Sequence, residues 1–179
     1  SVSPMIAGGR TVKVLHPNAK TVFIGPCMAK KAEIKEPDLK GAIDYVLTYE
    51  ELRDLFTTTD IDLEHLEEDN VPHASRAGIR YAYAGGVAEA VAATVKRLDP
   101  NRKIEVKVRR ADSVPDCKAM IDSILKGNRE GNFFEGMGCR GGCVGGPKAL
   151  VPKEQGKLNV TDKASQYLKS FQTKEYENI

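Results

Sequence analysis

The stretch at residues 133–147 decides how this chain is organised, and it reads Phe-Phe-Glu-Gly-Met-Gly-Cys-Arg-Gly-Gly-Cys-Val-Gly-Gly-Pro. Three residues separate its two thiols, Cys139 and Cys143, and glycines crowd around both. Glycine lets a backbone adopt left-handed conformations and approach a bulky group closely, but it weakens the interior of a helix or strand. We therefore expect a loop here that is held in shape by two thiolates binding a metal cluster.

The composition is that of an ordinary globular protein. The chain has 179 residues, of which 41% are hydrophobic and 29% charged, so we predict a single α/β domain over residues 1–179. The formal net charge of +2 gives no electrostatic case for nucleic acid or an anionic membrane as partner. No apolar run is long enough to span a bilayer, and the first residues do not read as a signal peptide. We therefore expect a cytoplasmic protein whose four cysteines are reduced.

The hydrophobic pattern predicts alternating helices and strands. In order, we expect a helix at 4–15, a buried strand at 21–24, a strand at 44–47, a helix at 49–56 after an N-cap at Thr48, a polar surface excursion at 57–76, a helix at 87–98, a half-buried strand at 103–109, a helix from Ser113 to residue 125, a basic loop at 147–157 and a helix at 163–171. This order favours an α/β fold in which a parallel-type sheet is flanked by helices.

A third thiol follows the first predicted strand. Cys27 comes directly after Gly25-Pro26, at the carboxyl end of that strand, which is where ligands bind in open α/β sheets. If the segments before Cys27 and Cys139 are neighbouring strands, then Cys27, Cys139 and Cys143 meet at one edge of the sheet. Cys117 falls on the apolar face of the helix from Ser113, so we interpret it as a core thiol.

Three gathered thiolates would bind a soft metal, either zinc or an iron–sulfur cluster. Structural zinc sites usually show two close pairs of ligands, whereas here one cysteine is alone and no histidine is near. His65 and His73 lie in the polar excursion and are expected to be solvated. A cluster tolerates wider ligand spacing and also accounts for the glycines, so we favour it over zinc. Lys30 and Lys31 would add positive charge beside the thiolates, although a solvated helix face would also explain them.

Three motifs resemble one known family. Residues 25–33, Gly-Pro-Cys-Met-Ala-Lys-Lys-Ala-Glu, resemble the Pro-Cys-x-x-Lys-x-x-Glu signature of iron-only ([FeFe]) hydrogenases. Residues 135–146 resemble the family's Glu-x-Met-x-Cys-x-x-x-Cys-x-x-Gly signature, and residues 84–90 are similar to its Gly-Gly-Val-x-Glu-Ala segment. The chain therefore resembles the later part of the large subunit's catalytic domain, which implies a lobe of that domain as its fold.

The resemblance implies a cofactor, the H-cluster, which is a four-iron four-sulfur cube joined through one cysteine sulfur to a two-iron unit. Carried over by position, Cys27 and Cys139 each hold an iron of the cube, and Cys143 holds a further iron and bridges to the two-iron unit. Lys30 donates to a cyanide of the two-iron unit, and Met137 packs against that unit. Glu33 and Glu135 are expected to hold loops through hydrogen bonds.

The family's first signature, Thr-Ser-Cys-Cys-Pro-x-Trp, is absent from the sequence, and we expect it before Ser1. In the family it supplies the fourth cube ligand and the thiol that passes protons, so we expect this chain alone to evolve no hydrogen. The sequence departs from the commoner family pattern at Gly25 and again from Val144 onward. These departures are similar to those of the divergent branches of the family, which include sensory hydrogenases.

The resemblance implies an iron-only hydrogenase that reduces protons to hydrogen reversibly. Its expected partners are ferredoxin or fused iron–sulfur domains, together with the N-terminal remainder of the parent chain. Three alternatives remain at this point: a hydrogen- or redox-sensing protein of the same fold, a hydrogenase-like iron–sulfur assembly factor, and a zinc-stabilised binding module. Lys30 and Met137 argue against the assembly factor, because a plain cube needs neither.

Overall fold

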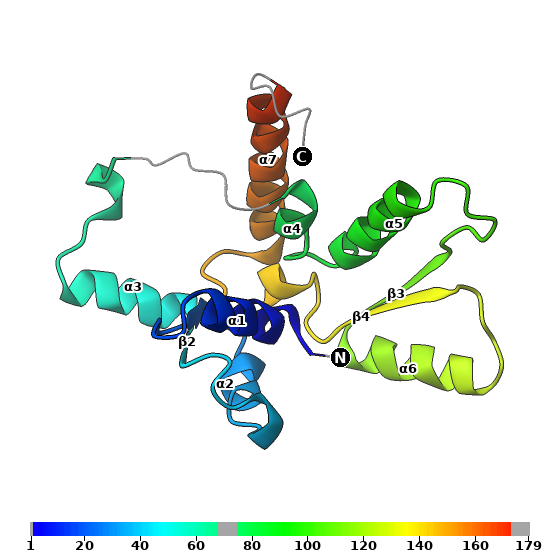
Figure 1. Ribbon diagram of the computed structural model, residues 1–179, viewed down its shortest axis with the longest axis horizontal. Helices are drawn as coiled ribbons and strands as arrows, with labels where there is room; N and C mark the ends of the chain where they lie inside the picture. The colour runs from blue at the N-terminus through cyan, green and yellow to red at the C-terminus, as the bar shows by residue number, and fades with distance from the viewer. Residues whose placement is uncertain (1, 68–74, 173–179) are drawn as a thin grey trace. The chain divides into compact units, whose positions relative to one another are not determined.

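The computed structural model describes residues 2–67 and 75–172, in which the chain divides into two compact units (Figure 1). The first unit consists of residues 1–68 and 147–150, and the second of residues 69–146 and 151–179. Each unit is described by itself below. The single domain expected from the sequence stays a prediction, because two compact units can belong to one domain.

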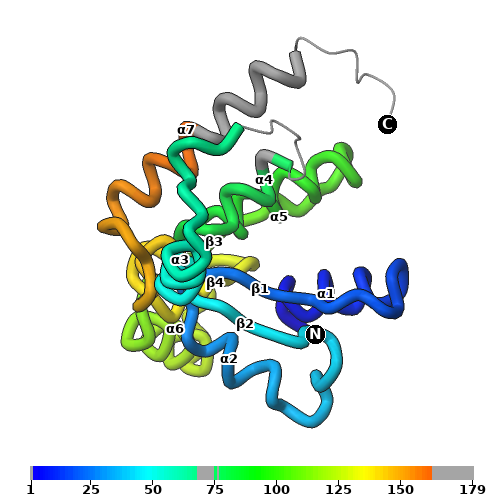
Figure 2. The backbone as a smooth tube through the Cα atoms, turned by 90° about the vertical axis from the view of Figure 1, so that its left-hand side faces the viewer, coloured from blue at the N-terminus to red at the C-terminus, as the bar shows by residue number. Residues whose placement is uncertain are grey.

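The first unit is built around a pair of parallel strands. Its elements are α1 (Pro4–Leu15), β1 (Val22–Ile24), α2 (Ala29–Glu33), the 3-10 turn η1 (Pro37–Leu39), β2 (Tyr45–Leu47), α3 (Tyr49–Thr58) and the 3-10 turn η2 (Leu63–His65). The strands β1 and β2 run parallel in a register that places Phe23 opposite Val46. Figure 2 shows the two strands side by side, with α2 in the connection between them.

Side-chain caps explain where the helices of the first unit begin. The Ser3 hydroxyl accepts a hydrogen bond from the backbone N–H of Ile6, and proline occupies the first turn of α1. At α3, Thr48 accepts from the N–H of Glu51, while the Glu51 carboxylate accepts from the N–H of Thr48 at 2.8 Å. This reciprocal pair is a capping box, and it confirms Thr48 as the predicted N-cap.

A small apolar core and one buried polar junction hold the first unit together. The core consists of Met5, Ile6, Ala42, Ile43 and Val46, with Phe23, Ile34 and Leu39 packed against it. Beside it, Asp44 accepts hydrogen bonds from Lys13 at 2.6 Å and from the N–H of Thr21 at 2.7 Å. The bond from Lys13 is the main cause that holds the pKa of Asp44 far below its usual range. The junction therefore joins α1 to both strands.

The second unit repeats the strand–helix–strand arrangement. Its elements are α4 (Arg76–Arg80), α5 (Gly86–Leu98), β3 (Val108–Asp112), α6 (Val114–Leu125), β4 (Phe133–Met137), the 3-10 turn η3 (Cys143–Gly145) and α7 (Lys153–Gln172). β3 and β4 are parallel, with Val108 opposite Phe133 and Asp112 opposite Met137. Helix α6 packs against both strands, α5 packs against β4, and Figure 1 shows the two helices on opposite sides of the strands. The predicted α/β fold, with parallel strands flanked by helices, is confirmed.

Two predicted strands were wrong in detail. The strand expected at 103–109 is β3, which begins only at Val108. The side chain of Asn132 bonds to the N–H of Lys107 and to the carbonyl of Glu105, so these residues are held outside the ladder. The strand expected to be buried, β1, leaves Val22 48% and Ile24 43% exposed, because within the described residues it pairs with β2 alone.

The sequence also missed strand β4, where the glycines predicted a loop. The space that a side chain at Gly136 would need is occupied by Cys117, whose Sγ lies 2.9 Å from the position of an added Cβ. Glycine at this position therefore lets α6 pack closely against the strand. The final helix, expected at 163–171, begins at Lys153 and replaces much of the expected basic loop. Gly156 lets it approach η3, because an added Cβ would lie 3.1 Å from Val144.

No helix in the described part of the chain combines the length and the apolar character that crossing a lipid bilayer requires.

Candidate functional site

The loop that carries Cys27 leaves the end of β1 and enters α2. The N–H of Gly25 donates to the carbonyl of Leu47 at 3.0 Å, which extends the β1–β2 ladder by one bond. The carbonyl of Pro26 accepts from the N–H of Lys148 at 3.2 Å, so the segment after residue 146 is tied to this loop. Gly25 and Pro26 are buried, whereas Cys27 is half-buried and forms no disulfide. The Cys27 thiol is thus placed by a fixed backbone at a strand end, as predicted.

Lys30 lies one helical turn beyond Cys27 and is held by Glu33. Its Nζ donates to Glu33 Oε2 at 2.5 Å, and both side chains are about one-quarter exposed (24% and 23%). Burial acts to raise the pKa of Glu33, but hydrogen bonds from Lys30 and from the Ser3 hydroxyl outweigh it and lower the pKa. Glu33 is therefore a carboxylate that orients the Lys30 ammonium and links α2 to the start of α1.

The lysine that follows the glycine-rich stretch belongs to the first unit as well. Lys148 donates from Nζ to Glu50 at 2.6 Å, at the N-terminus of α3. This hydrogen bond is the main cause that raises the pKa of Lys148. Lys31 makes a similar bond to Glu51 at 2.6 Å. Sequence reasoning missed the role of Lys148, because no local pattern pairs it with residues almost one hundred positions earlier.

In the second unit, Cys139 and Cys143 lie on a loop fixed by backbone hydrogen bonds. Its turn closes with the N–H of Gly142 donating to the carbonyl of Cys139 at 3.0 Å. The carbonyl of Gly141 accepts from Ala84 at 3.0 Å, and the N–H of Val144 donates to Ala82 at 2.9 Å. These two bonds attach the cysteine loop to the segment before α5, which contains the Gly-Gly motif.

Asp112 and two glycines complete the restraint of this loop. Asp112, at the end of β3, accepts from the N–H of Gly141 at 2.8 Å. Gly142 has a φ of +83°, and a Cβ there would lie 2.5 Å from the backbone nitrogen of Ala84. A Cβ at Gly145 would lie 1.9 Å from the carbonyl oxygen of Arg140. The glycines are therefore needed for close backbone packing, whatever the thiols bind.

Glu135 links strand β4 to the glycine-containing segment at the start of α5. Its carboxylate is 5% exposed and accepts from the N–H of Gly85 at 2.7 Å and from that of Ala88 at 2.9 Å. The first N–H groups of a helix have no partner within the helix, and the helix dipole favours an anion there. The expectation that Glu135 holds a loop through hydrogen bonds is confirmed.

Met137 ends strand β4, and Cys117 lies on helix α6, which packs against that strand. Met137 is half-buried and is the last residue of β4, two positions before Cys139. Its carbonyl accepts from the Sγ of Cys117 at 3.6 Å. Cys117 is half-buried beneath the strands, which agrees with the packing role predicted for it. Cys139 is half-buried, Cys143 is exposed, and neither forms a disulfide.

The predicted site residues fall into two groups. Cys27 and Lys30 belong to the first unit, and Met137, Cys139 and Cys143 to the second. The strands that precede Cys27 and Cys139 belong to different two-stranded sheets, so the expectation of a single sheet edge was wrong. In residues 2–67 and 75–172 no three His, Cys, Asp or Glu side chains gather as a candidate metal site, so the ligand set stays a prediction.

Of the two histidines in the polar excursion, one lies in the part of the chain that the structure describes. His65 is 82% exposed and pairs with Asp62, which agrees with a solvated role. His73 lies outside the described residues.

Comparison with known proteins identifies a family. The model of the family described as the iron only hydrogenase large subunit, C-terminal domain, matches residues 1–147. Iron hydrogenase 1 of Clostridium pasteurianum is 26% identical over 200 residues, covering 88% of this chain and 35% of the relative. The periplasmic [Fe] hydrogenase large subunit of Nitratidesulfovibrio vulgaris is 30% identical over 178 residues, covering 81% and 42%. The chain thus spans less than half the length of these two relatives.

Solved structures show the same fold. An [FeFe]-hydrogenase chain, from work on oxygen inactivation through the H cluster 2Fe subcluster, matches with a TM-score of 0.61 at 17% identity, covering 97% of this chain and 63% of that chain. A variant of the [FeFe]-hydrogenase HydA1 from Chlamydomonas reinhardtii matches with a TM-score of 0.59 at 20% identity, covering 89% and 57%. Because the name of one curated relative places it in the periplasm, the cytoplasmic location stays a prediction.

Proposed function

This chain belongs to the family of the iron-only hydrogenase large subunit, C-terminal domain, and from that premise we propose that it supplies three thiolate ligands to an H-cluster. Cys27 and Cys139 would each hold an iron of the four-iron cube. Cys143 would hold another iron and carry the sulfur that bridges to the two-iron unit. The family's motifs at residues 25–33 and 135–146 support this assignment.

The observation that carries the proposal is the restrained loop between Cys139 and Cys143. Its backbone is fixed from three sides, by Asp112, by the segment at 82–84 and by its own turn, while the thiols at its two ends stay out of any disulfide. A ligand loop that is already ordered loses little conformational entropy when a cluster binds. The donor set is also suitable, because thiolates are the ligands that iron–sulfur clusters take.

Lys30 would donate to an anionic ligand of the two-iron unit. An ammonium has three N–H donors, and the bond to Glu33 uses one of them, so Lys30 can stay oriented by Glu33 while it donates again. A hydrogen bond from a charged donor to an anion is about twice as strong as a neutral one. Met137, at the end of β4, would present a polarisable and adaptable side chain to the same unit.

When bound, the H-cluster supplies the reversible combination of two protons and two electrons into hydrogen. The residues of this chain would hold and orient it, which is the usual division of labour between a cofactor and its protein. For the whole protein we propose hydrogenase activity, with electrons delivered by ferredoxin or by fused iron–sulfur domains, and with the family's first signature in the N-terminal remainder of the parent chain.

Anaerobic reconstitution of the purified chain with iron and sulfide tests the thiolate assignment. A thiol reagent in the buffer can provide the cube ligand that this chain does not. We expect a broad absorption of thiolate-to-iron charge transfer and iron bound in proportion to the chain. Exchanging Cys139 and Cys143 for serine should abolish both signals, whereas Cys117→Ser should keep them. Equal iron uptake by the double variant would refute the assignment.

A further inference from the structure

Positive charge is concentrated in one part of the second unit, although the whole chain is nearly neutral. Residues 96–110 contain seven Lys and Arg against two Asp and Glu, a local excess of five, whereas the net charge of the entire chain is +2. The stretch runs from the last turn of α5 into β3, and every one of its charged residues is exposed. The small overall charge therefore conceals a basic surface.

Most of these cations have no carboxylate partner in the structure. Arg109 pairs with Glu130 at 2.9 Å, and Arg110 lies 4.0 Å from Glu89. Within the part of the chain that the structure describes, no carboxylate lies within 4.0 Å of the other five, which are Lys96, Arg97, Arg102, Lys103 and Lys107. Like charges repel one another at short range, so this grouping costs stability unless it attracts a partner.

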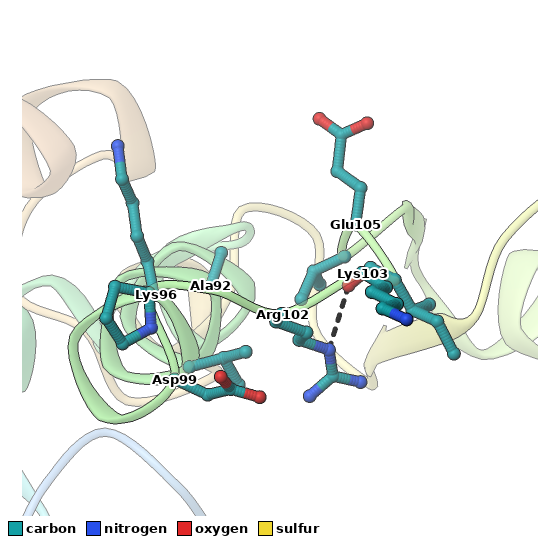
Figure 3. Close-up of a pocket in the computed structure, with 10 residues that line it drawn as sticks. Ala92, Lys96, Asp99, Arg102, Lys103 and Glu105 are labelled. Atoms are coloured by element: carbon teal, nitrogen blue, oxygen red, sulfur yellow. Dashed lines mark hydrogen bonds between the residues drawn. The ribbon is translucent and has the colours of Figure 1, made fainter.

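A cavity of about 330 Å³ opens among these cations. Figure 3 shows Ala92, Lys96 and Asp99 on the helix side of the cavity, with Arg102, Lys103 and Glu105 on the opposite side. The Nε of Arg102 donates to the carbonyl of Ile104 at 2.8 Å, which restrains the guanidinium of this lining residue (Figure 3). The other lining residues are Val95, Pro100, Ile104 and Val106, so the lining is half aliphatic and half charged.

Large apolar side chains are exposed beside the cations. Leu98 is 73% exposed and Ile104 is 62% exposed. An aliphatic centre surrounded by a charged rim is the usual anatomy of a protein–protein interface, where a few buried apolar anchors supply most of the binding energy. The cavity is also large enough to receive one apolar side chain of a partner.

We propose that this basic surface, in which Lys96, Arg102 and Lys103 line the cavity and Arg97 and Lys107 adjoin lining residues in the sequence, is a docking surface for an acidic protein segment that inserts an apolar side chain into the cavity. The positive side chains favour a partner of negative charge, and the aliphatic lining residues favour an apolar side chain as its anchor. A peptide suits the site better than a nucleic acid. No aromatic side chain lines the cavity for base stacking, which a single-stranded nucleic acid would use.

The inference goes beyond the hydrogenase assignment, because the surface contains none of the cysteines and needs no cluster. It is tested on the whole purified chain without iron, so its failure and that of the cluster proposal are distinguishable. The probe is a short fluorescein-labelled peptide of alternating Glu and Asp with one central Leu, and binding is followed by fluorescence anisotropy. We expect saturable binding that weakens as salt is raised, since exposed charges are screened over about 10 Å at 0.1 M salt.

Two charge reversals with the same change in net charge provide the comparison. Arg102→Glu combined with Lys103→Glu should weaken binding of the peptide about tenfold or more, because both residues line the cavity. Lys35→Glu combined with Lys40→Glu, at exposed sites in the first unit, should leave it within about twofold. Equal losses in both variants would overturn the proposal, and circular dichroism should show that both variants are folded.

The anchor is tested by changing the probe. A peptide with Ser in place of the central Leu should bind about tenfold more weakly, because it cannot bury an apolar side chain in the cavity. Equal affinity for the two peptides would overturn the proposed insertion. An oligothymidylate of equal charge should bind more weakly than the Leu peptide at the same salt concentration, and equal or tighter binding would overturn the choice of a protein partner.

Discussion

Glu135 shows how one buried carboxylate can position a distant segment. It stands at the centre of β4, yet its two oxygens accept from the backbone of Gly85 and Ala88, about fifty residues earlier. The charge is compensated by the N-terminus of α5 and needs no basic side chain. Because the same α5 segment holds the cysteine loop through Ala84, Glu135 indirectly supports the geometry of the thiols.

Glu135→Gln should therefore destabilise the second unit. The amide keeps one acceptor oxygen but turns an NH₂ group toward a backbone donor, and a buried donor without an acceptor costs about 1–3 kcal/mol. The measurement is the free energy of unfolding in urea. The matched change Glu105→Gln, at an exposed position, should alter that free energy by less than about 0.5 kcal/mol. Equal stability of the two variants would show that the charge of Glu135 is not needed.

Glu51 gives the first unit a pH-dependent contribution to stability. The hydrogen bond from Lys31, followed by those from the N–H and hydroxyl of Thr48, lowers the pKa of Glu51 from 4.5 to about 2. A carboxyl group whose pKa is lower in the folded state contributes its full stabilisation of that state at pH values above its pKa in the unfolded chain. That contribution is lost as the pH falls from 4.5 toward about 2.

Glu51→Gln should accordingly make the stability of the chain depend less on pH in the acidic range. The thermal midpoint of the wild-type chain should fall more steeply over this acidic range than that of the variant. Glu64→Gln, which removes an exposed carboxylate that caps no helix, controls for loss of charge alone. Parallel curves for wild type and Glu51→Gln would contradict the assigned role of the capping box.

At the scale of elements, the cysteine loop has little room for added side chains. Gly142→Ala would force an alanine to a φ of +83° and place its Cβ 2.5 Å from Ala84, whereas an alanine at Gly138 would meet nothing within 4 Å. With a ψ of −154°, Gly142 lies in a backbone region that is open essentially to glycine alone, and a side chain there costs about 1–3 kcal/mol. We therefore expect Gly142→Ala to lower the thermal midpoint and reduce iron uptake on reconstitution.

Gly138→Ala is the matched control for that experiment, because it adds the same methyl group four residues away. It should retain most of the thermal stability and iron uptake of the wild-type chain. Similar behaviour of the two variants would mean that the tight packing of the loop on residues 82–84 does not govern the site.

Local sequence signals predicted the helices far better than the strands. Thr48 and Ser113 mark helix starts because their side chains accept from the first backbone N–H groups, and α3 and α6 begin where these residues indicate. The extent of β3 and the existence of β4 were missed, because strand bounds depend on pairing. The amide of Asn132 and the space left by Gly136 decide those bounds, and neither has a periodic signature.

The sequence points to candidate ligands, whose role stays a prediction, but it does not point to the residues that hold their loops. Cys27, Cys139 and Cys143 stand out by residue type and surrounding glycines, and their motifs resemble those of the family that the comparisons then identified. Asp112 and Lys148 make long-range hydrogen bonds, and nothing in their immediate sequence indicates a partner. Sequence alone thus finds chemically special side chains more readily than the ordinary polar residues that hold them.

At the scale of the whole molecule, binding of the proposed H-cluster should be linked to folding. Cys27 belongs to the first unit and Cys139 and Cys143 to the second, and the free energy of metal binding adds to the free energy of folding. Anything that binds the folded state alone stabilises it by mass action. The reconstituted chain should therefore unfold at a higher temperature.

The most direct test of the central claim is a crystal structure of the anaerobically reconstituted chain, with anomalous scattering recorded at the iron absorption edge. We expect one iron–sulfur cluster whose irons are bound by the Sγ atoms of Cys27, Cys139 and Cys143, with Cys117 beneath β4 and away from the metal. Iron held without Cys27, or a single zinc-like ion between Cys139 and Cys143, would contradict it.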